Sequence, residues 1–420
     1  MATKKKYRIN SFFAGIGGFD IAFERHGFST QLLCEINPFC NQILDRHWSE
    51  VRKFLDINQI QDKDIPDAEV WCGGFPCQDI SVARGSSIRL GLEGQRSGLF
   101  YRFAELIEQK TPEVVIIENV SGLFTSNKGR DFGVILQTLS SLGYGIAWRL
   151  LNSRYFGVPQ SRSRVYLCCY RNNPQKALKV MFDYQGADKP KNERIDFITE
   201  ESQPEEYPKV PKVAYCLAAT SGRHTGTDWS RTYVVCKEGV RRLSPVESER
   251  LQGFPDNWTL PLNENPNNED INTLRYTAIG NAVTVPVVEW IAERVYRILK
   301  QSSEENELNQ LITSYPDFSK SSWNEMPLSE INFSDATVNC KWQRGGVVWK
   351  GKYIECNAYP TPSKIKQSSL LKLIERGQDN PIYFLSPNAA EGILRRVDNQ
   401  NRSLFKPLRI ALEKLRAKNS

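Results

Sequence analysis

Short apolar runs alternate with helix-like stretches along the first 175 residues, and this alternation limits the possible folds more than any other feature. The apolar runs lie at residues 9–13, 31–35, 68–72 and 114–117. The helix-like stretches between them lie at residues 19–26, 38–47 and 99–110. Strands that alternate with helices favour a parallel sheet flanked by helices. The sequence therefore predicts an α/β domain with a mostly parallel sheet over residues 1–175.

The pattern changes in steps beyond this domain. Residues 176–240 are rich in Lys, Pro, Glu, Asp and Gly and indicate a small irregular domain. Residues 241–300 return to helix-like patterning, which we interpret as the completion of the first domain. Residues 301–335 are polar and acidic, as is typical of a linker. Residues 336–420 form a basic C-terminal extension, with a strand-like stretch, a helix capped by Ser386 and a basic amphipathic helix over residues 406–418.

Composition narrows the class of protein. A chain of 420 residues with 40% hydrophobic and 25% charged residues is typical of globular proteins. Ten cysteines without a Cys-x-x-Cys pair, together with three histidines, give no metal-ligand spacing, so no metal site is expected. We expect no membrane span, no signal peptide and a cytoplasmic location. The formal charge of +7 permits an acidic partner such as nucleic acid without demonstrating one.

A glycine-rich loop follows the first predicted strand. Residues 13–19 are Phe-Ala-Gly-Ile-Gly-Gly-Phe, and glycines let the backbone turn sharply and approach a ligand. The start of the following helix favours an anionic group, either a pyrophosphate or the carboxylate of S-adenosylmethionine. Glu35 follows the second candidate strand, and Asp56 belongs to a third candidate strand at Leu55-Asp56-Ile57. Carboxylates at these places can bind ribose hydroxyls and an adenine amino group. Order and spacing alone do not separate a methyltransferase from a dehydrogenase.

The stretch Gly73-Gly74-Phe75-Pro76-Cys77-Gln78 is the one best suited to chemistry. Pro76 fixes its own φ and restricts Phe75, so Cys77 is predicted on a loop after a strand rather than inside an element. A cysteine placed in this way is available for reaction. Other cysteines lie inside apolar runs, and we interpret them as small buried hydrophobes: Cys34, Cys72, Cys168 and Cys169.

Five motifs follow one another along the chain. They are the glycine loop, Pro76-Cys77-Gln78, Glu118-Asn119-Val120, Gln160-Ser161-Arg162-Ser163-Arg164 and Gly280-Asn281-Ala282-Val283. In this order they resemble the DNA (cytosine-5-)methyltransferases of restriction–modification systems and phages, over residues 8–300. The resemblance implies a Rossmann-like S-adenosylmethionine-dependent methyltransferase fold with target recognition by residues 176–240. It also implies a monomer that acts on double-stranded DNA, with a matching restriction endonuclease in the same system and no stable complex required.

The resemblance implies a covalent mechanism for the residues of these motifs. A Cys77 thiolate adds to carbon 6 of cytosine, which makes carbon 5 able to attack a sulfonium methyl group. A protonated Glu118 beside ring nitrogen 3 relieves the negative charge that develops. Arg162 is expected to supply positive charge near the thiolate, and Arg164 to hold the cytosine carbonyl oxygen. Taken alone, both arginines would favour a solvated strand edge, but their place after Tyr155-Phe156-Gly157-Val158-Pro159-Gln160 favours the functional role.

Cofactor and DNA contacts are expected at further positions. Cofactor contacts are expected at Phe13, Gly15, Ile16, Gly18, Glu35, Ile36, Asp56, Ile57, Pro76, Asn281 and Ala282. A glycine-containing loop over residues 81–98 is expected to close over a cytosine flipped out of the duplex. DNA contacts are expected at Ser81, Arg84, Gln95, Arg96, Gln160, Arg223 and Arg231. Asn119 is expected to orient the loop that carries Cys77.

Three alternatives remain open at this point. An RNA cytosine-5 methyltransferase shares the architecture, a degenerate methyltransferase fold could bind DNA without catalysis, and a dehydrogenase would explain the glycine loop alone. The role of the C-terminal extension is also open between DNA binding, partner binding and a packed structural module. One departure from the family is Cys216-Leu217, where the family often has Thr-Leu.

Overall fold

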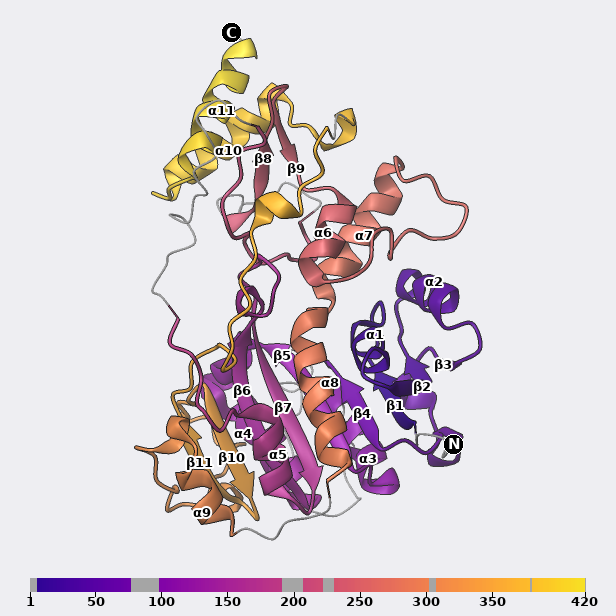
Figure 1. Cartoon of the computed structure of the whole chain (residues 1–420), viewed down its shortest axis with the longest axis vertical. Helices are drawn as coiled ribbons and strands as arrows, with labels where there is room; N and C mark the ends of the chain where they lie inside the picture. The colour runs from indigo at the N-terminus through magenta and orange to yellow at the C-terminus, as the bar shows by residue number, and fades with distance from the viewer. Residues whose placement is uncertain are drawn as a thin grey trace.

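The computed structural model describes residues 6–76, 98–190, 207–221, 230–301, 307–377 and 380–419. Within these residues, nine strands form one sheet in the order β11-β10-β6-β7-β5-β4-β1-β2-β3. Figure 1 shows this sheet in the lower part of the molecule and a smaller lobe above it. The strands are β1 (Tyr7–Phe12), β2 (Phe28–Cys34), β3 (Arg52–Phe54), β4 (Val70–Gly73), β5 (Val114–Val120), β6 (Tyr144–Asn152), β7 (Ser163–Arg171), β10 (Gly345–Trp349) and β11 (Lys352–Cys356).

The sheet has a parallel half and an antiparallel half. Strands β3, β2, β1, β4 and β5 pair in parallel. Strands β7, β6, β10 and β11 continue the sheet with antiparallel pairing. The predicted α/β, Rossmann-like class is confirmed, and the parallel half holds the four apolar runs from which it was predicted. The third candidate strand is displaced, because β3 ends at Phe54 and Asp56 caps a short 3₁₀ turn instead.

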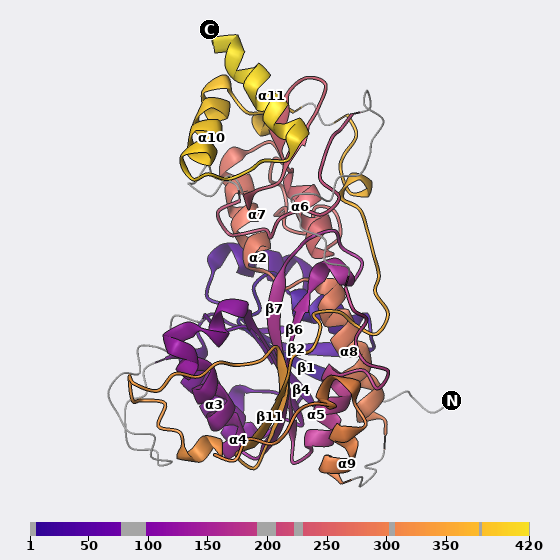
Figure 2. The same cartoon turned by 90° about the vertical axis from the view of Figure 1, so that its left-hand side faces the viewer.

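Helices cover both faces of the sheet (Figure 2). Helices α1 (Gly18–Glu24), α5 (Pro174–Met181) and α8 (Val285–Leu299) contribute to the core on one face. Helices α3 (Leu99–Lys110) and α4 (Arg130–Ser141) contribute to the core on the other. In β5, Ile116 belongs to the first core and its neighbours Val115 and Ile117 to the second, as the two-residue period of a strand requires. Burial on both faces explains the continuous apolar run in this strand.

Among the described residues, no helix has the length and apolar character that a membrane crossing requires.

The upper part of the molecule in Figure 1 is termed the recognition lobe, after the role that the sequence predicts for residues 176–240. It comprises β8 (Tyr233–Val235), β9 (Val240–Arg242), α6 (Pro245–Gln252), α7 (Glu269–Asn281), α10 (Pro387–Asn399) and α11 (Lys406–Arg416). A third hydrophobic core joins β8 and β9 to α10 and α11. Helix α2 (Pro38–His47), capped by the Asn37 side chain, lies below α7 in Figure 2. The lobe therefore combines the predicted irregular region with residues from the far end of the chain.

The segment interpreted as a linker differs in the structure. It contains α9 (Leu308–Thr313), and five of its apolar side chains are buried against the cores of the sheet: Ile312, Tyr315, Phe318, Leu328 and Phe333. The strand-like stretch that follows is a hairpin, β10–β11, which pairs with β6. The apolar residues of the segment 301–335 are widely spaced among polar ones, so local composition did not reveal that this segment packs against the central sheet.

We predict that Gly346→Ala destabilises the protein because β10 packs directly against β6. A Cβ at Gly346 would lie 2.1 Å from Cη2 of the buried Trp148 ring. Overpacking of this kind costs about 1–3 kcal/mol in the free energy of unfolding, measurable by urea denaturation. Gly122→Ala is the control, because its nearest neighbour would be 3.9 Å away. Equal stability of both variants would contradict an integral role for the hairpin.

Candidate functional site

Glu118 and Arg164 form an ion pair near the end of β5. Arg164 lies opposite Val120 in the antiparallel β5–β7 ladder, so its side chain is the diagonal neighbour of Glu118. Nε of Arg164 lies 3.0 Å from Oε1 of Glu118. Glu118 is only 9% exposed. The two strands therefore place a buried carboxyl and its cation where open α/β sheets bind their ligands, at the carboxyl end of a parallel strand.

Burial raises the pKa of the Glu118 carboxyl, and the nearby charges of Arg164 and then Arg162 offset part of that rise. Desolvation disfavours the ionised form, whereas a guanidinium group favours it. The balance lets Glu118 hold a proton at higher pH than an exposed glutamate does. It is thus suited to sharing a proton with a bound group.

Arg162 is buried and bonds to backbone rather than to a carboxylate. One terminal nitrogen donates to the carbonyl oxygen of Leu217 and the other to that of Ala282, both at 2.8 Å. Burial lowers the pKa of Arg162, and the neighbouring Arg164 lowers it further. The guanidinium therefore fastens the start of β7 to two other segments. These contacts give Arg162 a bracing role. The positive charge expected from it near the thiolate stays a prediction.

Cys77 lies outside the described residues, but the chain that leads to it passes the Glu118 carboxylate. Nδ2 of Asn119 donates to the carbonyl oxygen of Phe75 at 3.0 Å, and this bond is buried. A Cβ placed on Gly74 would lie 3.5 Å from Oε2 of Glu118. The residues between β4 and Pro76 are therefore fixed beside the end of β5.

The glycine loop and Glu35 form a backbone cradle beyond β1 and β2. Phe13 and Gly15 have positive φ angles of 55° and 58°. The carboxylate of Glu35 accepts from the backbone N–H of Gly15 and from that of Asn37, each at 2.8 Å. Each carboxylate oxygen retains a further lone pair for a ligand. The loop is thus held in its turned conformation with acceptors exposed at the strand ends.

Two exposed apolar side chains flank this cradle. Ile36 is 72% exposed and Leu55 is 62% exposed, at the ends of β2 and β3. Directly after Leu55, Asp56 accepts from the backbone and side chain of Asn58, both at 2.9 Å. Exposed apolar residues beside fixed polar groups are typical of ligand sites. Ile57 is buried, so its side chain belongs to the core.

The Gly280–Val283 motif joins the glycine loop to the recognition lobe. A Cβ on Gly280 would lie 2.3 Å from the backbone carbon of Ala218, and a Cβ on Gly18 would lie 2.6 Å from Cγ2 of Val283. Both glycines are thus needed for close approach. Ala282 is buried, whereas Asn281 is exposed at the end of α7. Ile16 of the loop is buried and Pro76 is exposed.

The prediction that Gln160 contacts DNA requires correction, because its side chain is fully buried. Its amide nitrogen donates to the carbonyl oxygen of Leu251 and to Oε1 of Gln252, and its amide oxygen accepts from the backbone of Leu217. These bonds satisfy the side chain inside the protein. Gln160 therefore holds Leu217, as Arg162 does, and joins it to the end of α6.

The remaining predicted DNA contacts lie mostly beyond the described residues. Arg231 is half-buried and donates to the carbonyl oxygen of Thr220 at 2.7 Å. Outside the described ranges lie Ser81, Arg84, Gln95, Arg96 and Arg223.

Sequence reasoning missed Trp258, which holds the site. Nε1 of Trp258 donates to the carbonyl oxygen of Ile16 in the glycine loop at 2.8 Å, and His47 stacks on the Trp258 ring at 3.5 Å. Nε2 of Gln252 donates to the carbonyl oxygens of Ile279 and Ala282. The partners are far apart in the chain, so no local pattern indicated these contacts.

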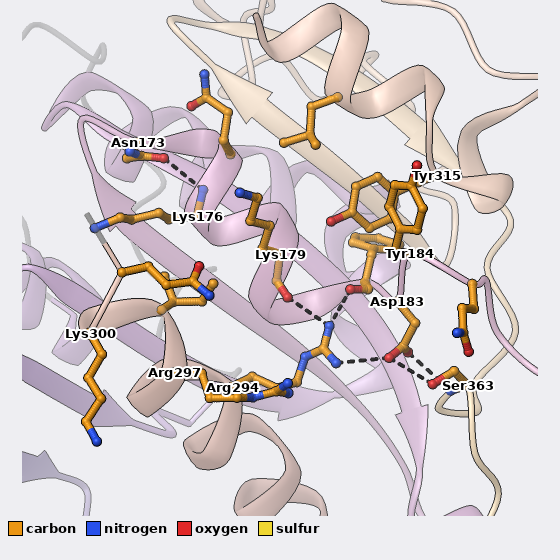
Figure 3. A pocket seen from close by; sticks show the side chains of 16 residues that line it. Asn173, Lys176, Lys179, Asp183, Tyr184, Arg294, Arg297, Lys300, Tyr315 and Ser363 are labelled. Carbon is orange, nitrogen blue, oxygen red and sulfur yellow. Dashed lines mark hydrogen bonds and ion pairs between the residues drawn. The ribbon is translucent and has the colours of Figure 1, made fainter. Parts of the chain in front are cut away.

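A basic groove of about 800 Å³ lies away from this site, along α5 and the end of α8 (Figure 3). Its lining includes Lys176, Lys179, Arg294, Arg297 and Lys300. Arg294 forms an ion pair with Asp183, with 2.9 Å between a terminal nitrogen of Arg294 and Oδ1 of Asp183. The end of α8 adjoins the start of β1, because the Tyr7 hydroxyl donates to the carbonyl oxygen of Leu299. The groove therefore lies near the amino ends of the parallel strands, whereas Glu118 lies near their carboxyl ends.

The glycine loop after β1, the acid after β2 and the buried carboxyl on β5 occupy the positions expected for a Rossmann-like methyltransferase. Solved structures support this fold. A mutant DNMT2 of Spodoptera frugiperda is 18% identical with a TM-score of 0.50, covering 69% of this chain and 99% of that one. The Entamoeba histolytica methyltransferase EhMeth is 19% identical with a TM-score of 0.50, covering 71% and 100%.

Sequence comparison supplies the family. The family model described as C-5 cytosine-specific DNA methylase matches residues 7–214 and 201–297. Type II methyltransferase M2.BsuMI of Bacillus subtilis is 33% identical over 69% of this chain and 75% of its own length. Type II methyltransferase M.NgoBI of Neisseria gonorrhoeae is 31% identical over 67% and 91%. The chain belongs to the C-5 cytosine-specific DNA methylase family.

Proposed function

We propose that this protein is a sequence-specific DNA methyltransferase that uses Cys77 to methylate carbon 5 of cytosine from S-adenosylmethionine. The observation that carries the proposal is the buried Glu118–Arg164 pair beside the chain that leads to Cys77. The relatives named as Type II methyltransferases support a restriction–modification setting. The proposal includes action as a cytoplasmic monomer, with a matching endonuclease that forms no stable complex with it.

The residues around β1, β2 and β3 fit S-adenosylmethionine. Glu35 presents acceptors for ribose hydroxyls while its carboxylate is fixed by two backbone N–H groups. Ile36 and Leu55 offer exposed apolar surface for a planar ring, and Asp56 can accept from an amino group. Phe13 and Ala282 complete the proposed lining. When bound, the cofactor supplies an electrophilic methyl group.

The target cytosine must leave the duplex, because stacking hides carbon 6 from a thiolate. Sulfur of Cys77 then bonds to carbon 6, and the electron pair of the 5,6 double bond becomes available at carbon 5. Glu118 shares a proton with ring nitrogen 3 as negative charge develops there. Arg164, already 3.0 Å from Glu118, is placed to hold the cytosine carbonyl oxygen.

Release reverses the addition. After methylation, carbon 5 carries both a methyl group and a hydrogen. Loss of that proton to water returns its electron pair to the 5,6 double bond. The carbon 6–sulfur bond breaks in the same process, and the thiolate of Cys77 is restored. The nitrogen 3 proton returns to Glu118.

We predict that Glu118→Gln lowers the single-turnover rate by roughly 10²-fold or more, the range in which general acid–base groups contribute. Glutamine keeps the shape and can still accept from Arg164, but it cannot share a carboxyl proton. Because the pKa of Glu118 is raised, the wild-type rate should persist above the ordinary glutamate range and fall as pH rises through that pKa. The variant should lack this fall. Rates equal to wild type at every pH would refute the role.

We predict that cells expressing the chain acquire methylcytosine at one short recurrent DNA sequence, whereas cells expressing Cys77→Ala do not. Base-resolution sequencing of methylcytosine makes the measurement. Methylation by the alanine variant would rule out the thiolate mechanism. Wild-type protein that is soluble and binds the cofactor, yet leaves DNA unmethylated, would favour the RNA alternative, which methyl incorporation into transfer RNA then tests.

A further inference from the structure

Positive charge is concentrated at the C-terminal end of the chain, beyond the residues that the family model matches. Residues 380–420 contain eight Lys or Arg and three Asp or Glu, a net charge of +5, whereas the whole chain has a net charge of +7. The family match ends at residue 297. The charge that suits a polyanionic substrate thus lies largely in a segment to which the family match assigns no role.

This segment is built into the recognition lobe rather than attached as a tail. The backbone N–H of Leu385 donates to the carbonyl oxygen of Val240 at 2.8 Å, and Phe384 forms a bridge with Arg241. The segment before α10 therefore extends the edge of the β8–β9 pair. Apolar side chains from both helices are buried against that pair: Ile393, Leu394, Val397, Leu408 and Leu412.

One ion pair joins the two helices, and other cations face solvent. Arg409 of α11 lies 2.6 Å from Asp398 of α10 and 2.9 Å from Glu413. Two of the three acids in the segment are thereby paired with one guanidinium. The exposed cations that have no salt bridge among the described residues include Arg395, Lys406, Lys414 and Arg416. These four residues are termed the lobe cations.

The helix pair lies at the outer end of the recognition lobe in both views (Figures 1 and 2). In Figure 2, α10 is on the same side of the molecule as α3, the helix that follows the segment with Cys77. A duplex held beside Glu118, at the end of β5, would extend toward the lobe. Cations at such a position meet phosphates, which set the register of a protein on DNA without reading its sequence.

We propose that the lobe cations bind the phosphate backbone of duplex DNA beside the target cytosine, so that the C-terminal helices act as a second half of the recognition lobe. The inference rests on the proposed function, because it takes DNA as the substrate. The buried contacts with β8 and β9 transmit the position of the phosphates to the strands of the recognition region. Specificity itself stays with residues that reach base edges.

The test compares two full-length variants with equal loss of charge. The lobe variant carries Arg395→Gln, Lys406→Gln, Lys414→Gln and Arg416→Gln. The control variant changes four cations of the basic groove in Figure 3, Lys176→Gln, Lys179→Gln, Arg297→Gln and Lys300→Gln. Neither set belongs to the proposed catalytic or cofactor residues. Thermal unfolding and S-adenosylmethionine binding establish that both variants are folded.

The measurement is the Kd for a duplex at several salt concentrations. Each lost phosphate contact lowers the slope of log affinity against log salt by about 0.9, so we expect the lobe variant to lose about 2 to 4 units of slope. Its affinity should fall alike for different duplex sequences, and the control variant should keep the wild-type slope. A wild-type slope in the lobe variant, or equal losses in both variants, would overturn the inference.

Failure of the proposed function gives a different result. Wild-type protein that does not bind duplex DNA at any salt concentration would overturn both proposals together. Wild-type protein that binds duplex DNA while the lobe variant binds it identically would overturn the inference alone.

Discussion

The buried guanidinium of Arg162 is the contact on which the rest of the site depends. It joins the start of β7 to Leu217 in the recognition region and to Ala282 before α8. Burying a cation is costly unless it is hydrogen-bonded, so the bonds of the two terminal nitrogens hold these segments in register with one another. Gln160 and Gln252 add neutral hydrogen bonds among the same segments. The lobe is therefore positioned over the sheet by buried polar contacts.

Arg164 shows how the same short motif supplies both the brace and the site. Arg162 lies at the start of the strand and bonds to backbone oxygens, whereas Arg164, two residues on, reaches Glu118. Asn119, next to Glu118, holds the carbonyl oxygen of Phe75 and so fixes the chain that leads to Cys77. Chemistry and lobe position are thus coupled through adjacent residues. A change in the position of the lobe would act directly on the proposed catalytic groups.

The sequence was informative where structure depends on local pattern. The apolar run at residues 114–117 became β5, and the predicted helices at residues 38–47 and 99–110 are α2 and α3 with the same bounds. Ser386 caps α10 as expected, because capping involves only the backbone N–H of Ala389 three residues later. The Rossmann-like class followed from the alternation of such elements.

Contacts between distant segments were not accessible from the sequence. Gln160 stands in a motif with two arginines, and nothing local shows that its amide is enclosed by Leu217 and Gln252. Trp258 holds the glycine loop across more than 200 residues of chain. The hairpin β10–β11 pairs with β6, and the preceding polar segment buries scattered apolar residues. Each of these depends on the tertiary arrangement, which periodicity does not encode.

The most direct test of the central claim is a search for the bond between Cys77 and cytosine. A duplex in which 5-fluorocytosine replaces cytosine is incubated with the protein and S-adenosylmethionine, and the digested complex is analysed by mass spectrometry. A base can remove hydrogen from carbon 5 as a proton but cannot remove fluorine as a cation. The elimination is therefore blocked, and the ring should remain attached to sulfur. We expect a nucleotide adduct on the Cys77 peptide that requires the cofactor. An adduct on another cysteine, or none under conditions that methylate ordinary duplex, would contradict it.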